Sequence, residues 1–498
     1  MKRRHLLAAG AAPLLAPLAG AARGLDDATV RARIAADPLR TPFLGVADGA
    51  APSATALLRG RWPAALRGHF YRNGPALMAR AGERYRHWFD GDGMVQRYSL
   101  GDGQVTHLGR LVQTTKLARE RAAGRLAVPV LGTYIEDTLP LTGPDGANTA
   151  NTHVVAHAGR LLALWEGGSA HELDAATLET IGPVTWRADL KGTPFSAHPK
   201  VDAQGHLWNI GSMPGTLLVW HLAPDGQLAQ AQVLRVPEVG GLVHDMAITE
   251  RHLVVPLPPL APLSFGPTPD GGARRFAMQP GRPLTLLVID KADLSRQWRF
   301  ELPAQMVFHV ANAWDAGPGE VALSFIGGRG LDFLNDGATA LMAALPRQPT
   351  ADPQLLHCRL HLASGRIQVH GEPFDMEFPR VHPARVGLRQ RWVSTAAAWR
   401  HRPQDLFHGW QLTDLDSGRT QRVDMGDHAV TEEPVWVPKP GGRGELDAWL
   451  LATHFDARRQ ATVLNLLDAA HLADGPLAQA VLPYALPLGF HGSFVPAD

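Results

Sequence analysis

Four histidines share a sequence context that separates them from the rest, because each lies among apolar or small residues with a potential turn or strand after it. They are His198, His244, His309 and His491. Taken singly, each is most simply a core histidine bonded to a backbone carbonyl, but imidazole is also the commonest metal ligand. The one cysteine, Cys358, excludes a cysteine-rich zinc or iron–sulfur site. The four histidines together therefore raise the hypothesis of a metal centre built from imidazoles.

Three carboxylates, Glu166, Glu377 and Glu433, are embedded in apolar strand-like sequence, where a charge is unfavourable unless it is paired. An ion pair with an arginine such as Arg380 is the simpler explanation for each. In chain order the three glutamates and four histidines are about 54 residues apart on average, and a four-stranded propeller blade with its loops takes about 40–50 residues. The spacing is compatible with one polar residue per blade, directed at a central axis.

The elements that must position these residues are short strands. The chain holds 51 glycines and 40 prolines among 498 residues, and dipeptides such as Asp-Gly and Ser-Gly supply the positive φ that tight hairpins need. Residues 217–222 and 228–236, on either side of a Pro-Asp-Gly turn, predict one β-hairpin. Helical patterning is sparse, with short helices expected within 110–126 and 335–345. The pattern favours an all-β protein with a closed, radially repeated sheet, and a propeller fits best.

Charge and the N-terminal residues bear on partners and location. Lys plus Arg is 48 and Asp plus Glu is 47, so the basic excess of a nucleic-acid-binding protein is missing and we predict no nucleic-acid partner. Residues 1–22 combine a charged start, an Ala-rich apolar stretch and small residues at the end, which is typical of an export signal. Arg3 and Arg4 resemble a twin-arginine signal, with a Sec signal as the alternative. The N-terminal segment therefore predicts an exported, periplasmic protein.

A series of ordered sequence blocks resembles the signature of the carotenoid cleavage oxygenases. The blocks are FYRNGP (70–75), HWFDGDGM (87–94), NT (151–152), LWEGG (164–168), AHPK (197–200), HDMAIT (244–249), FHVANAW (308–314), EPVWVP (433–438) and GFHG (489–492). They extend over nearly the whole chain after the N-terminal signal. Two residues depart from the family pattern, since Phe494 and Trp436 stand where Trp and Phe are usual.

The resemblance implies a seven-bladed β-propeller over residues 23–498, with a dome of loops and short helices above an axial metal site. It also implies the site residues: a non-haem Fe(2+) bound by His198, His244, His309 and His491, with Glu166, Glu377 and Glu433 behind the ligands and Thr152 near the open side of the ion. A glutamate that accepts the Nδ1–H of a ligand imidazole compensates the charge of the ion and orients the ring. Four ligands on an octahedral ion leave room for O2, and the Thr152 methyl would restrict access to it.

The activity that the resemblance implies is oxidative cleavage, with O2, of one C=C bond of an apolar conjugated substrate into two carbonyl products. We expect a carotenoid or apocarotenoid. A stilbene-type phenylpropanoid is the alternative, for which Lys116 and Tyr134 are a conceivable polar pair. Isomerase-like use of the iron and a non-catalytic exported propeller that binds apolar ligands are further alternatives. Peripheral membrane contact through residues 256–265 or 331–345 is a hypothesis, against packing of these residues on the dome, and the sequence carries no signature of an oligomeric state.

Overall fold

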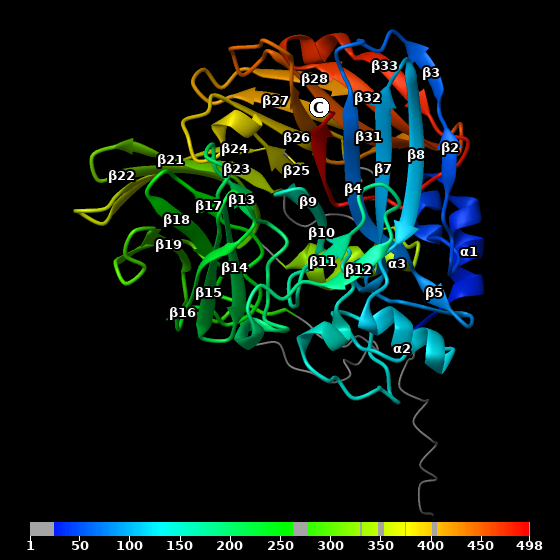
Figure 1. Ribbon diagram of the computed structural model, residues 1–498, viewed down its shortest axis with the longest axis horizontal. Helices are drawn as coiled ribbons and strands as arrows, with labels where there is room; N and C mark the ends of the chain where they lie inside the picture. Colours follow the sequence, from blue (N-terminus) through cyan, green and yellow to red (C-terminus); the bar gives the residue numbers. More distant parts are fainter. Residues whose placement is uncertain are drawn as a thin grey trace, which may run out of the picture.

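The structure is a computed structural model, and it describes residues 24–261, 276–328, 331–346, 353–373, 375–400 and 406–497. Its strands form seven large antiparallel sheets, which are the blades of a β-propeller, and one small three-stranded sheet (Figure 1). Inner strands of neighbouring blades contact one another, as β34 does with β9 and β21 with β25. The all-β class and the seven-bladed propeller expected from the sequence are confirmed. The predicted export signal, residues 1–22, lies outside the described residues.

The blades are numbered here from the N-terminus. Blade 1 contains β34 (His491–Pro496), β4 (Gly68–Leu77), β7 (Asp92–Gly101), β8 (Gln104–Leu111) and β2 (Ser53–Thr55). Blade 2 contains β9 (His153–His157), β10 (Arg160–Leu164), β11 (His171–Leu173) and β12 (Thr180–Pro183). Blade 3 contains β13 (Lys200–Val201), β14 (Leu207–Met213), β15 (Thr216–Leu222) and β16 (Leu228–Arg235). Blade 4 contains β17 (Ala247–Ile248), β18 (His252–Leu257), β19 (Leu284–Asp290) and β20 (Gln297–Leu302).

The remaining blades follow in the same order. Blade 5 contains β21 (Met306–Gly317), β22 (Glu320–Gly328), β23 (Gln354–His361) and β24 (Arg366–Pro373). Blade 6 contains β25 (Asp375–Arg380), β26 (Trp392–Ala398), β27 (Gly409–Asp414) and β28 (Thr420–Asp424). Blade 7 contains β29 (Ala429–Thr431), β30 (Val435–Pro438), β31 (Ala448–Asp456), β32 (Ala461–Asp468), β33 (Pro476–Val481) and β3 (Leu57–Gly60). The small sheet contains β1 (Leu25–Asp26), β6 (Glu83–Arg84) and β5 (Ala79–Arg80).

Two exchanges of strands close the ring. The C-terminal strand β34 pairs with β4 in blade 1, with His491 opposite Asn73. The N-terminal strand β3 pairs with β33 in blade 7, with Leu57 opposite Val481. The first and last blades are thus each completed by a strand from the other end of the chain, and closure leaves few unpaired strand edges.

The blades pack face to face through alternating side chains. In β19, Leu287 and Ile289 pack in a core cluster with blade 3, whereas Leu286 and Val288 pack with blade 5. Because both faces of such a strand are covered, it reads as a continuous apolar run instead of an alternating one. The predicted hairpin of residues 217–236 is confirmed as β15 paired with β16.

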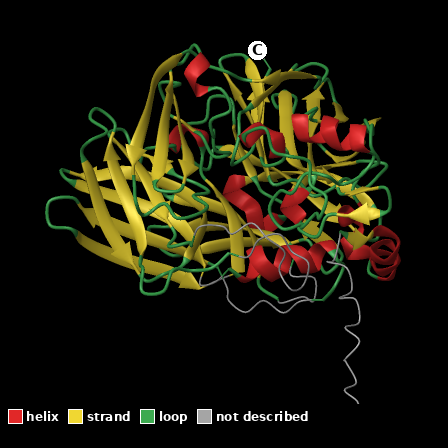
Figure 2. Cartoon of the chain, turned by 90° about the horizontal axis from the view of Figure 1, so that it is seen from below, coloured by secondary structure: helices red, strands yellow, loops and turns green. Residues whose placement is uncertain are grey.

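Helices are few and short among the described residues, and Figure 2 shows them beside and between long loops. They are α1 (Asp27–Ala36), α2 (Thr115–Ala123), α3 (Ala338–Met342), a π-helix (Phe333–Gly337) and 3-10 helices at Pro38–Leu44, Trp88–Asp90, Pro144–Ala147, Ala188–Leu190, Pro383–Arg385 and Ala469–Asp474. Both helices expected from the sequence form, but they are shorter. The α2 helix starts after the Thr114 cap and ends at Gly124, whose positive φ stops it.

The two segments considered for membrane contact turn most of their described apolar side chains inward. Leu257 and Leu260 are buried, and so are Leu334 and Leu341, whereas Leu345 is 44% exposed. Residues 262–265 of the first segment lie outside the described residues. No helix in the described part of the chain is long and apolar enough to cross a bilayer.

Candidate metal centre

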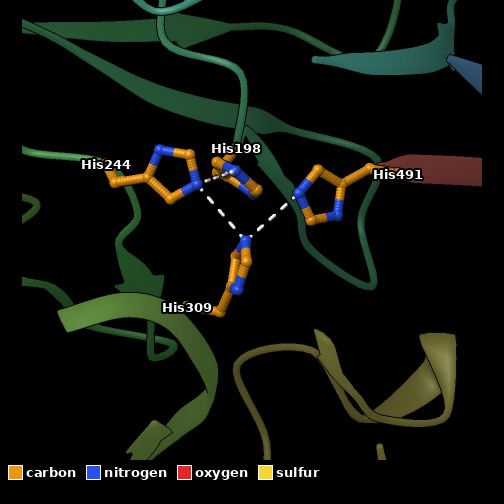
Figure 3. Close-up of side chains that lie close together, drawn as sticks. All are labelled: His198, His244, His309 and His491. Atoms are coloured by element: carbon orange, nitrogen blue, oxygen red, sulfur yellow. Dashed lines mark hydrogen bonds between the residues drawn. The ribbon is translucent and has the colours of Figure 1, made fainter. Parts of the chain in front are cut away.

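The four histidines singled out in the sequence come from four different blades and meet at one point (Figure 3). His198 and His244 lie just ahead of the inner strands β13 and β17, His309 lies in β21, and His491 begins β34. Their rings are buried, and one nitrogen of each lies within 4.8 Å of the others. The Nε2 atoms of His198 and His244 are 3.1 Å apart, those of His244 and His309 3.3 Å, and those of His309 and His491 3.1 Å.

These separations fit a shared metal ion. Nitrogen ligands about 2.1 Å from one ion are about 3.0–3.4 Å apart when the angle between them is a right angle or tetrahedral. A hydrogen-bonded ring of imidazoles is a poorer explanation, because each shared pair would need one donor and one acceptor while every Nε2 faces the same centre. The donor set is four imidazole nitrogens, which suits a borderline transition metal and leaves the charge of the ion uncompensated by its ligands.

The electrostatics favour a neutral, metal-binding imidazole at two of the four histidines. Burial and then the neighbouring imidazoles hold the pKa of His198 and that of His491 well below the usual histidine value. Burial also acts to lower the pKa of His309, but the adjacent Glu377 carboxylate outweighs it and the pKa is raised. The Nε2 lone pairs of His198 and His491 are therefore free at neutral pH.

Two of the predicted glutamates hold the far side of a ligand ring. Glu433 Oε1 accepts the Nδ1–H of His491 at 2.8 Å, and its Oε2 accepts the backbone N–H of Gly492 at 2.9 Å. Arg380 also lies 3.5 Å from this carboxylate, so the ion pair expected as the simpler explanation coexists with the histidine contact. Glu377 accepts the Nδ1–H of His309 and the backbone N–H of Phe378. Both carboxylates fix the tautomer in which Nε2 faces the metal.

The third glutamate supports its histidine less tightly. Glu166 Oε1 lies 2.9 Å from His244 Nδ1, yet the geometry is not that of a hydrogen bond, and neither atom has a hydrogen-bond partner among the described residues. Glu166 is also the most exposed of the three side chains, at 20% against 15% for Glu377 and 1% for Glu433. The contact is an electrostatic one without a directed hydrogen bond, and a small rotation of either side chain would complete it.

The fourth ligand has a supporting carboxylate that sequence reasoning missed. Asp245 is buried, and its Oδ2 lies 3.9 Å from His198 Nδ1. It also pairs with Lys200 Nζ at 2.8 Å and accepts the backbone N–H of Val310 at 2.7 Å. Asp245 therefore links the segments that carry His198, His244 and His309. Its signal in the sequence was a carboxylate directly after a candidate ligand.

A fifth histidine, His153, packs against the cluster without joining it. Its Nδ1 donates to the carbonyl of Ala197 at 2.8 Å, and its ring centroid is 5.4 Å from that of His491. Burial lowers the pKa of His153 to about 4, so the ring is neutral. His153 fixes the backbone beside His198. The sequence offered a signal for it in its position next to Thr152.

The metal centre opens into an apolar cavity of ≈ 290 Å³. Its walls are mainly aromatic and aliphatic, including Trp88, Phe89, Phe308, Phe333 and Phe490. Thr152 and Glu166 also line it, as do three of the four histidines: His244, His309 and His491. The Thr152 hydroxyl donates a hydrogen bond to Asn151 Oδ1 at 3.1 Å, so its proton is already bound within the protein. Such a cavity suits a long apolar ligand.

Residues considered for other roles lie away from the cavity. Lys116 does not line it: the ammonium is fully buried and bonds Asp92 at 2.9 Å, Glu120 at 3.1 Å and the Tyr85 hydroxyl at 2.5 Å. Tyr134 is not among the lining residues either, so the pair considered for a phenolic substrate is not presented to the cavity. The two departures from the family pattern, Trp436 and Phe494, also pack elsewhere, and neither lines the cavity.

The fold and the site together define a metal-centred propeller, and comparison with known proteins assigns the family. The model of the family "RPE65: Retinal pigment epithelial membrane protein" matches residues 47–496. The apocarotenoid-15,15'-oxygenase of Synechocystis sp. is 30% identical, over 88% of this chain and 92% of its own length. The lignostilbene-alpha,beta-dioxygenase isozyme III of Sphingomonas paucimobilis is 27% identical, over 89% and 93%. The cobalt-substituted Synechocystis apocarotenoid oxygenase superposes with a TM-score of 0.81 at 27% identity, over 93% and 99%. The chain belongs to this family, the carotenoid cleavage oxygenases.

Proposed function

We propose that the protein is a non-haem Fe(II) dioxygenase that cleaves one C=C bond of a carotenoid or apocarotenoid into two carbonyl products. The observation that carries this proposal is the convergence of four buried imidazoles at an apolar cavity. The similarity to the apocarotenoid-15,15'-oxygenase of Synechocystis sp. and to a carotenoid 9,10(9',10')-cleavage dioxygenase of Arabidopsis thaliana supports this substrate class. When bound, the iron would supply the redox chemistry that activates O2.

The chain's own residues position the reactants. His198, His244, His309 and His491 would hold the ion. Glu433 and Glu377 would keep two of these rings in the binding tautomer. The aromatic walls would align the polyene and exclude water, which protects reactive species from side reactions. The Thr152 methyl would narrow the approach for O2, because the hydroxyl of this side chain is occupied by Asn151.

A phenylpropanoid substrate is the second candidate, and the lignostilbene dioxygenase relative favours it. The placement of Lys116 argues against this candidate, because its ammonium forms ion pairs with Asp92 and Glu120. Cleavage assays on a C20–C30 apocarotenal and on a 4-hydroxystilbene, run side by side, distinguish the two. Faster turnover of the stilbene would overturn our choice.

The activity itself is tested with purified protein loaded with Fe(II), Co(II) or no metal, incubated with an apocarotenal with and without O2. We expect two carbonyl products only with iron and O2 together. Turnover without O2, or equal turnover after removal of the metal, would contradict a dioxygenase and favour an isomerase or a metal-independent reaction.

We also propose that residues 1–22 direct export to the periplasm and that the mature chain touches membranes peripherally. The proposal rests on the charged, Ala-rich N-terminus and on the lipid-soluble nature of the substrate. N-terminal sequencing of protein from the periplasmic fraction should show cleavage near residue 22, and intact Met1 on cytosolic protein would refute export.

The membrane contact is tested by co-sedimentation with liposomes, which should weaken in Leu345→Ser, because Leu345 is an exposed apolar residue of the segment 331–345.

A further inference from the structure

Glu432 is a cavity-lining carboxylate that contacts no ligand histidine. Glu432 precedes Glu433 in the chain and lies between β29 and β30. It lines the cavity, although its side chain is only 7% exposed. Two other lining glutamates, Glu166 and Glu377, face the histidines of the metal centre. Glu432 therefore needs an explanation of its own, because an acidic group in an apolar cavity is unfavourable without partners.

The Glu432 carboxylate is anchored through one of its two oxygens, Oε1. Its backbone carbonyl accepts the Trp410 indole N–H at 2.7 Å, and its Oε1 accepts the backbone N–H of Gly489. Arg72, a buried guanidinium, donates to the same oxygen at 3.3 Å. These contacts anchor the carboxylate and supply an opposite charge. They use a single oxygen of the two.

The second oxygen, Oε2, accepts no hydrogen bond from any residue that the structure describes, and it is not sealed in the protein interior. Glu432 is a cavity-lining residue, so a ligand bound in the cavity lies next to the residue that carries this unbonded oxygen. Val430, Leu488 and Phe490, which also line the cavity, have no side-chain donor, and the Thr431 hydroxyl already donates to the Gly409 carbonyl. An anchored carboxylate with one free oxygen is suited to accept a hydrogen bond from a hydroxyl group.

We propose that Glu432 is a specificity-determining residue that accepts a hydrogen bond from a hydroxyl group carried by the substrate. The preferred substrate would then be a hydroxylated conjugated alkene, bound with its hydroxyl on the wall that carries His491. This inference rests on the proposed function and narrows its substrate class. The hydroxyl could belong to the ring of an apocarotenoid or to a phenol, since both present the same O–H donor.

The discrimination has a clear physical origin. A substrate without the hydroxyl would exclude water from the cavity and leave Oε2 buried without a donor, and buried polar groups left unpaired weaken binding strongly. We expect a preference of about ten- to a hundred-fold for the hydroxylated member of a matched pair, as for a buried hydrogen bond to a charged group. The preference should appear in binding as well as in kcat/KM.

The experiment compares two matched pairs: an apocarotenal with and without a ring hydroxyl, and 4-hydroxystilbene with stilbene. Iron-loaded wild type, Glu432→Leu and Glu432→Gln are measured for cleavage, and for anaerobic binding by quenching of tryptophan fluorescence. The control is Thr431→Val, which changes the neighbouring lining residue, whose hydroxyl already donates to the Gly409 carbonyl at 3.1 Å. Iron content is measured for every protein.

We expect the preference for the hydroxylated compound in wild type and Thr431→Val, its loss in Glu432→Leu, and a reduced preference in Glu432→Gln, whose amide oxygen can still accept from Gly489. The pair that shows the larger preference identifies the source of the hydroxyl. Equal binding of both members in wild type, or an unchanged preference in Glu432→Leu, overturns the inference. Should Glu432→Leu lose iron, an unchanged preference in Glu432→Gln overturns it. If no compound is cleaved but the anaerobic preference depends on Glu432, the inference stands and the proposed reaction fails.

Discussion

The two ends of the cavity are built by different means. At the metal end, each histidine lies at or near the start of an inner strand, and a carboxylate stands close behind the ring. At the other end, the wall consists of aromatic rings from distant segments, such as Trp88 packed at 4.7 Å from Phe490 and Phe333 at 6.1 Å from Phe89. His309 and His491 are thus held by directed hydrogen bonds to carboxylates within the ring of blades, whereas much of the apolar wall depends on packing between loops and short helices.

Because of this difference, we expect substitutions in the two regions to affect different properties of the protein. Changes at the metal end should act through metal retention, and changes in the wall should act through substrate binding with the metal in place. The following predictions test that separation, from the largest effect to the smallest.

His491→Ala should abolish activity and strongly reduce bound iron. The backbone of residue 491 pairs with Asn73, and alanine preserves that pairing, so the β-sheet circular dichroism should persist. Iron content by elemental analysis and product formation are measured on the same preparation. An active variant with full iron would show that His491 is not a ligand.

Glu433→Gln should weaken iron retention by roughly 10–100-fold, because it removes the charged partner of His491. The matched variant Glu166→Gln should have a smaller effect, since Glu166 is 20% exposed and makes no directed hydrogen bond to His244. Competition with a chelator measures both. Equal losses, or a larger loss in Glu166→Gln, would mean that burial and alignment of the carboxylate do not determine its contribution.

Phe333→Ala should raise the KM for an apolar substrate about tenfold or more, as expected from the loss of roughly 1.5–3 kcal/mol of apolar contact. Phe333 lines the cavity and packs against Phe89 and Trp88. Iron content should equal that of wild type. Loss of iron in this variant would refute the independence of the two ends.

The smallest expected effect is the reaction of the Cys358 thiol with an alkylating reagent in the native protein. The thiol is buried in blade 5, and burial raises its pKa to about 12, so almost no thiolate is present at pH 8. Native protein should resist iodoacetamide at pH 8 and react after unfolding, as mass spectrometry can show. Rapid labelling of the native protein would indicate that this blade opens far more readily than its packing allows.

Much of the metal end could be predicted from the sequence, because its residues lie in short ordered blocks and their types are chemically distinctive. The seven predicted metal-end residues fall one to a blade, so the interpretation of their spacing is confirmed, and each of the three glutamates lies beside a histidine. Asp245 was missed because a single carboxylate next to a candidate ligand has many possible partners, and only folding brings it beside Lys200 and Val310. The roles of these residues in binding iron stay predictions.

The wall could not be predicted in the same way. Phe89, Phe333 and Phe490 are ordinary apolar residues in sequence, and what brings them together is the packing of loops far apart in the chain. The Lys116 pairing illustrates the same limit: a lysine between motifs could face a ligand or an acid, and two buried carboxylates decide for the acid. Contacts between distant segments determine the substrate end of the site.

The most direct test of the account is a crystal of the iron-loaded protein measured above and below the iron absorption edge. We predict one strong anomalous peak enclosed by the Nε2 atoms of His198, His244, His309 and His491, within bonding distance of all four. A peak elsewhere, or one bonded to fewer than four of these nitrogens, would contradict the metal centre on which the proposed cleavage depends.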